Sequence, residues 1–120
     1  MTHLTLDLLG TFAATLDGHA THDFRSNKAR GLLAYLAMEA NRAHARSSLA
    51  ALLWPEATDE SAANNLRLTL HRLRQALDKT SPGAAAALLH TQGGQIRLDA
   101  AALTLDVARF QAELAQVAAH

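Results

Sequence analysis

The chain has no cysteine, two prolines and few aromatic residues: one Trp, one Tyr and three Phe among 120 residues. Without cysteine, neither a disulfide framework nor a thiolate metal site can form. No apolar run approaches the ~20 residues that a membrane-spanning helix needs. Residues 1–4 (MTHL) lack the basic region and apolar run of a signal peptide. We therefore expect a cytoplasmic protein with no membrane partner.

The chain also lacks net charge, because 11 basic residues balance 11 acidic ones. The charges are unevenly spread, however: residues 25–79 hold nine bases and five acids, a local charge of +4. The local field decides attraction to phosphate, so the neutral total does not exclude nucleic acid. The 49% apolar fraction and the length predict one globular unit around a single core.

The first 24 residues carry the pattern of a small antiparallel sheet. Apolar residues alternate with polar ones over residues 4–16, which is the period of a half-buried strand. Asp17-Gly18 is a turn signal, and residues 20–24 have the composition of a further short strand.

Three helices are predicted next. Ser26 is a candidate N-cap for a helix to about residue 40, and a shorter helix over residues 46–54 stops at Pro55. The third helix, residues 60–79, has the most regular apolar pattern in the chain. The residues expected to face the core are Leu49, Leu52 and Leu53 in the second helix, and Ala63, Leu66, Leu70, Leu73 and Leu77 in the third. The acidic segment between them, residues 55–59, is expected to be a loop without an apolar anchor.

The C-terminal part begins with an Ala-rich run, residues 84–87, which fits a short helix or a loop. Residues 88–98 form a predicted hairpin around Gly93-Gly94, since both glycines can adopt the positive φ of a two-residue turn. Asp106 is a candidate N-cap for a last helix.

Strands, three helices and a hairpin follow one another in the order of a winged helix-turn-helix. We therefore predict an α+β fold with an N-terminal antiparallel sheet, three helices, a C-terminal β-hairpin wing and one extra C-terminal helix. The predicted domain covers residues 1–100, and residues 101–120 are assigned to the extra helix.

One face of the third helix has the character of a helix that lies in a DNA groove. At ~100° per residue, the residues opposite the apolar stripe carry hydroxyl, amide and basic groups, and no acid interrupts them. They are Ser61, Asn64, Leu68, His71, Arg72 and Gln75. An ordinary solvated helix face is the alternative, but an exposed leucine at position 68 calls for a contact such as a thymine methyl.

Segments in nearly the whole chain resemble the OmpR-type winged-helix domain of the Streptomyces antibiotic regulatory proteins and related bacterial transcriptional activators. The matching segments are residues 8–12 (LLGTF), 28–37 (KARGLLAYLA), 49–56 (LAALLWPE), 64–67 (NNLR), 70–77 (LHRLRQAL), 95–98 (QIRL) and 106–110 (DVARF). The last of them resembles the start of the helical activator domain that usually follows in such proteins.

This resemblance implies sequence-specific binding of double-stranded DNA, with the third helix in the major groove and the wing at the minor groove. The expected base-reading residues are Asn64, Leu68, Arg72 and Gln75. The expected DNA-backbone contacts are Arg25, Lys28, Arg46, Arg67, Thr69, His71, Arg74 and Arg97. The resemblance further implies that Pro55, Glu56 and Asp59 contact RNA polymerase, and that copies of the chain bind direct repeats.

The sequence departs from the family pattern at two positions. Ala45 stands where a Ser or Thr often caps the second helix, unless that helix starts later, at Ser47. Gln95 stands where the wing often has an aromatic residue.

Other classes of function find little support. His19 and His22 lie close in sequence but have no third ligand nearby, and zinc sites need three or four. No nucleophile, carboxylate pair or phosphate-binding loop is recognisable, so we expect neither an enzyme nor a cofactor. The remaining alternative is a winged helix that binds another protein instead of DNA.

Overall fold

A computed structural model describes residues 2–7, 12–21, 24, 26–40 and 42–105 of the chain. Arg25, His22 and the helix predicted from Asp106 onward lie outside these residues.

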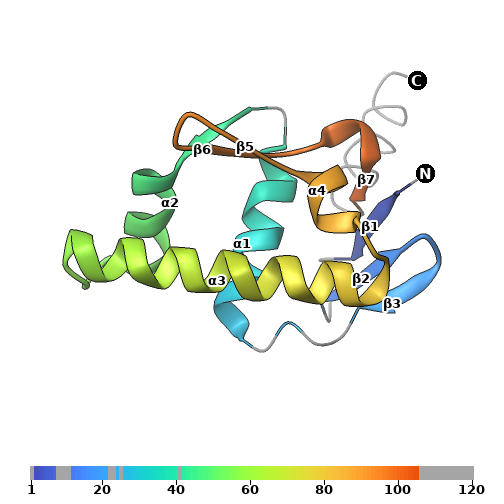
Figure 1. The fold of residues 1–120 in the computed structure, drawn as a ribbon, viewed down its shortest axis with the longest axis horizontal. Helices are drawn as coiled ribbons and strands as arrows, with labels where there is room; N and C mark the ends of the chain where they lie inside the picture. Colours follow the sequence, from blue (N-terminus) through green and yellow to red (C-terminus); the bar gives the residue numbers. More distant parts are fainter. Residues whose placement is uncertain (1, 8–11, 22–23, 25, 41, 106–120) are drawn as a thin grey trace, which may run out of the picture.

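Among the described residues, the predicted order of strands, three helices and a hairpin is confirmed (Figure 1). The helices of the structure are α1 (Asn27–Met38), α2 (Arg46–Leu53), α3 (Asp59–Thr80) and α4 (Ala84–Leu88), followed by a 3-10 turn, η1 (Ala100–Ala102). Its strands are β1 (Leu4–Asp7), β2 (Ala13–Leu16), β3 (His19–Thr21), β4 (His44–Ala45), β5 (Leu89–Gln92), β6 (Gln95–Leu98) and β7 (Leu103–Leu105). The Ala-rich run is therefore a short helix rather than a loop.

The N-terminal sheet has four strands in the order β3-β2-β1-β7. The antiparallel pairing of β1 with β2 and of β2 with β3 was predicted, but β7 was not. It runs parallel to β1, with Leu4 opposite Leu103, so the assignment of all residues from 101 onward to a helix was wrong. A three-residue strand is too short to show a period, and only its distant partner β1 fixes its conformation.

The wing is the predicted hairpin of β5 and β6, extended by the two-residue strand β4 on the outer edge of β6. Gly93 and Gly94 have φ angles of 58° and 76°, as expected for this turn. The amide of Arg46 donates a 2.9 Å hydrogen bond to the carbonyl of Gly94. The wing tip is thereby attached to the first residue of α2.

The two longest described helices, α1 and α3, start at side-chain caps. Ser26 Oγ accepts a hydrogen bond from the amide of Ala29 at the start of α1, as predicted, and Thr58 Oγ1 accepts one from Ser61 at the start of α3. The helix α2 begins at Arg46, behind Ala45 and not at Ser47, with no side-chain cap.

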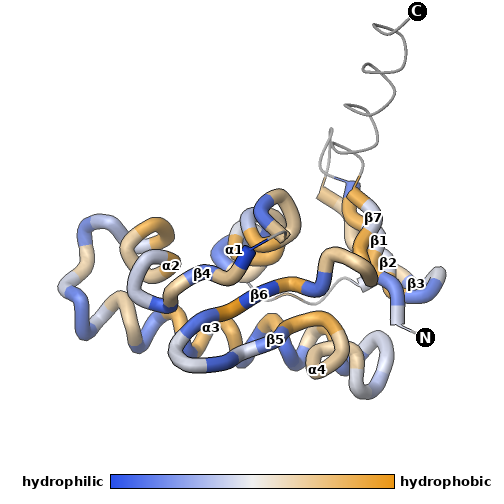
Figure 2. Tube along the Cα trace, turned by 90° about the horizontal axis from the view of Figure 1, so that it is seen from above, coloured by the Kyte–Doolittle hydropathy of each residue, from blue (hydrophilic) through white to orange (hydrophobic). Residues whose placement is uncertain are grey.

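The core lies between the helices α1, α2 and α3, the inner face of the N-terminal sheet and the wing strands. The stripe of α3 is buried as predicted from Leu66 to Leu77, but it begins at Ala62, and Ala63 is exposed. Leu52, expected to face inward, is 52% exposed. Figure 2 shows the N-terminal sheet at one end of the molecule and α2 at the other, so the sheet lies away from α2, whereas its strand β3 contacts α3.

Candidate nucleic-acid interface

The outer face of α3 is an exposed polar surface, as the helical wheel predicted. Ser61, Asn64, His71 and Gln75 are all exposed, and Leu68 is 48% exposed. No aspartate or glutamate lies between Ser61 and Gln75. This stretch covers four turns of a helix of 22 residues, which is about 33 Å long at 1.5 Å per residue.

Two neighbouring side chains on this face are held together. Arg67 donates a hydrogen bond of 3.1 Å to Oδ1 of Asn64, one turn earlier on the helix. The amide nitrogen of Asn64 and the remaining guanidinium N–H groups of Arg67 stay available as donors. The pair can therefore present donors to an anionic or acceptor-rich surface.

The structure corrects one predicted contact on α3. Thr69 is only 5% exposed, so it cannot reach a phosphate. It follows Leu66 by three residues, which places it one helical turn away at the edge of the buried stripe. Arg72 and Arg74 are half-buried and flank the exposed face.

The acids closest to this face are held at the ends of α3. Asp59 and Glu60 occupy the first turn, where the helix dipole favours negative charge. Asp78, near the other end, accepts a 2.9 Å hydrogen bond from the amide of Ala85 in α4. The central part of the face is left with basic and neutral groups.

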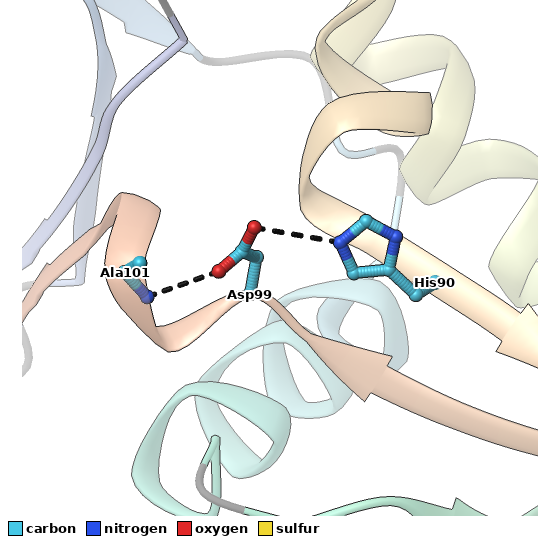
Figure 3. Close-up of polar contacts among 3 residues, drawn as sticks. All are labelled: His90, Asp99 and Ala101. Atoms are coloured by element: carbon cyan, nitrogen blue, oxygen red, sulfur yellow. Dashed lines mark hydrogen bonds and ion pairs between the residues drawn. The ribbon is translucent and has the colours of Figure 1, made fainter.

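The wing presents a second polar face. In the hairpin register, His90 pairs with Arg97 and Gln92 with Gln95, which places all four side chains on one side, around a small hollow. His90 also lies 3.5 Å from a carboxylate oxygen of Asp99, whose other oxygen accepts a hydrogen bond from Ala101 (Figure 3). Only Arg97 of this group was predicted from the sequence, although the alternation around Gly93-Gly94 could have indicated the other three.

Two further basic residues differ in their surroundings. Arg46 is exposed in the first turn of α2, beside the wing tip. Lys28 donates a hydrogen bond to the carbonyl of Leu53, and its ammonium lies 5.5 Å from the centre of the Trp54 ring. Lys28 therefore links the start of α1 to the end of α2, and its contact with the DNA backbone stays a prediction.

The loop between α2 and α3 exposes Pro55 and Glu56, and Asp59 is exposed at the start of α3. The prediction that this loop lacks an apolar anchor was wrong, because Ala57 is half-buried against the core. Thr58, and neither Glu56 nor Asp59, caps α3. The carboxylates of Glu56 and Asp59 therefore do not serve as the N-cap of α3.

Among the described residues, no three His, Asp or Glu side chains come together as a possible metal site. Within the same part of the chain, no helix is long and apolar enough to cross a membrane.

Residues 25–95 match the family described as "Transcriptional regulatory protein, C terminal". Among solved structures, the chain is similar to EmbR of Mycobacterium tuberculosis, determined in complex with a low-affinity phosphopeptide, with 25% sequence identity and a TM-score of 0.66. The similarity covers 82% of this chain and 26% of the EmbR chain, so this chain spans about a quarter of that protein. No curated protein matches it significantly in sequence.

The family match includes α1, α2, α3 and most of the wing, and the similarity to EmbR extends over the same fold. Together they confirm the resemblance that the sequence motifs indicated. The chain belongs to the family of winged-helix DNA-binding domains of bacterial transcription regulators.

Proposed function

We propose that this domain binds specific double-stranded DNA sequences by placing α3 in the major groove and the wing at the adjacent minor groove. The observation that carries the proposal is the exposed face of α3, which has no carboxylate between Ser61 and Gln75. A major groove about 12 Å wide admits such a helix, and a carboxylate in the middle of the face would be repelled by the phosphates on either side.

Base edges are read by Asn64, Leu68, Arg72 and Gln75. Amides and guanidinium groups recognise purines through paired hydrogen bonds, and Leu68 supplies an apolar contact for a thymine methyl. The DNA backbone is contacted by Arg46, Arg67, His71 and Arg74 from the helices and by Arg97 from the wing. Phosphate contacts of this kind fix the register of the protein on the duplex.

The domain acts within a transcription activator, and the loop of residues 55–59 contacts RNA polymerase. Glu56 is exposed and Asp59 follows it in the first turn of α3. These carboxylates favour a protein neighbour, because next to phosphate they would weaken DNA binding.

The test distinguishes the loss of a base-specific contact from the loss of a positive charge near the phosphates. DNA sites are first selected from a random duplex pool with the wild-type chain, and affinities of Arg72→Ala are then measured by fluorescence anisotropy on selected and random duplexes. We expect a loss of about 1–3 kcal/mol on the selected site, a smaller loss on random DNA and relaxed preference at one base pair.

Lys79→Ala is the matched control. It removes the same charge two turns later, in the last turn of α3, where the neighbouring Asp78 is bonded to α4. Sequence preference should be unchanged in this variant. An equal loss on selected and random DNA for Arg72→Ala would contradict base reading by this residue.

A further inference from the structure

A cleft of about 460 Å³ lies between α2 and α3. Its apolar lining comes from Ala50, Ala51 and Trp54 on one side and Ala62, Ala63 and Leu66 on the other. Alanine side chains end at Cβ, so the two helices touch without filling the space between them. The cleft has the size of a small-molecule site, which is roughly 300–1,000 Å³ in proteins.

Basic side chains outnumber acidic ones in the lining of the cleft. Arg46 from the first turn of α2 and Arg67 from α3 both line it, against the single carboxylate of Asp59. Arg46 is exposed, and no hydrogen bond or ion pair joins its guanidinium to another described residue. Arg67 is held by Asn64 through only one of its N–H groups, so the others can still donate.

The start of α2 adds to this positive character. Ala45 offers no side-chain acceptor and the first turn holds no acid, so no side chain of the turn offsets the positive end of the helix dipole beside Arg46. An occupant that complements the cleft thus combines an apolar body with one anionic group.

We propose that the cleft between α2 and α3 binds a small aromatic carboxylic acid. The aromatic body lies among the alanines and against Trp54, and the carboxylate is bound by Arg46 and Arg67. Planar guanidinium groups bind carboxylates through two parallel hydrogen bonds, which favours this anion over a spherical one.

Such a ligand competes with DNA, a consequence that rests on the proposed function. Arg46, Asn64 and Arg67 line the cleft and also belong to the proposed DNA-contacting surface. Guanidinium groups that hold the ligand are not free for phosphate, so the ligand acts as an antagonist of DNA binding.

The chain contains a single tryptophan, so the indole N–H of Trp54 gives one isolated signal in a ¹⁵N-correlated NMR spectrum. We would titrate the wild-type chain with 2-naphthoate and with its neutral analogue naphthalene-2-carboxamide. The expected result is a saturable shift of the Trp54 signal with 2-naphthoate, and about tenfold weaker binding of the amide because it lacks the charge-assisted hydrogen bonds.

Ala63→Leu fills the cleft from an exposed position, and Ala86→Leu makes the same change on the exposed side of α4 as a control. We expect binding to be lost in the first variant and kept in the second, with thermal melts verifying that both are folded. Undiminished naphthoate binding by folded Ala63→Leu, or equal affinity for the amide, would overturn the proposed site.

Competition is measured separately, with saturating 2-naphthoate added to the protein–DNA complex. DNA affinity should fall severalfold for the wild type and stay constant for Ala63→Leu. An unchanged affinity in the wild type contradicts the antagonism. If the chain does not bind DNA at all, the proposed function fails, while the NMR titration still decides the ligand site.

Discussion

Ala45 occupies the N-cap position of α2 without the group that a cap normally supplies. Its φ and ψ angles, −66° and 138°, are those of an N-cap residue, yet no side chain accepts a hydrogen bond from the first turn. The amide of Arg46 is bonded to Gly94 of the wing, so the remaining amides of that turn lack a side-chain acceptor. Ala45, which differs from the Ser or Thr often found at this position in the family, therefore leaves α2 without a side-chain cap.

Ala45→Ser should raise the free energy of unfolding by about 1 kcal/mol, because the serine hydroxyl can accept from the second or third residue of the helix. Urea unfolding followed by circular dichroism measures the change. Ala43→Ser, at an exposed position two residues earlier, is the control and should have almost no effect. No gain from Ala45→Ser would mean that water or the wing already satisfies these amides.

The outward-facing residues of α3 could be predicted from the sequence, because a long amphipathic helix fixes which side chains point outward. Asn64, Leu68 and Gln75 were predicted by this rule, and all are exposed. The contact expected of Thr69 came from the family resemblance and not from this rule, and it is wrong because Thr69 is buried at the edge of the stripe. The rule for amphipathic helices failed for Leu52, because the eight residues of α2 give too few turns to define a buried stripe.

Elements with a strong local signal were predicted, and those that depend on distant partners were not. The period of α3 and the glycine pair of the wing are local features. The strands β4 and β7 have two and three residues, and each exists because a strand far away in the sequence pairs with it. Helix and strand propensities cannot report such pairings.

The loop of residues 55–59 is the element whose role can be separated from DNA binding. Glu56→Ala in the full regulator should lower transcription activation while DNA affinity stays constant, because Glu56 is exposed and α3 is capped by Thr58. Affinity and transcription are measured side by side. Glu39→Ala, which removes an acid at the end of α1, serves as control. If Glu56→Ala leaves both quantities unchanged, the loop does not contact polymerase.

On the scale of the whole molecule, each chain offers one α3 and one wing to DNA. A single module of this size makes a small interface and binds weakly on its own. We expect two copies to occupy neighbouring sites in the same orientation, so that footprints of the regulator protect direct repeats. Footprints centred on inverted repeats would contradict this arrangement and imply a two-fold symmetric dimer instead.

The uneven distribution of charge along the chain, rather than its net charge of zero, should determine the affinity for DNA. Five arginines, Arg46, Arg67, Arg72, Arg74 and Arg97, lie on α2, α3 and the wing. The acids of the central part are at the end of α1, at the ends of α3 or in the loop. A protein that bound another protein through the same fold would show no counterion release from phosphate.

The most direct test of DNA binding is therefore a salt titration of the wild-type chain on random duplex DNA by fluorescence anisotropy. If three to five of these arginines neutralise phosphates, a plot of log affinity against log salt concentration should be linear, with a slope of about −2.7 to −4.5. An affinity that does not depend on salt, or no binding at low salt, would contradict the account.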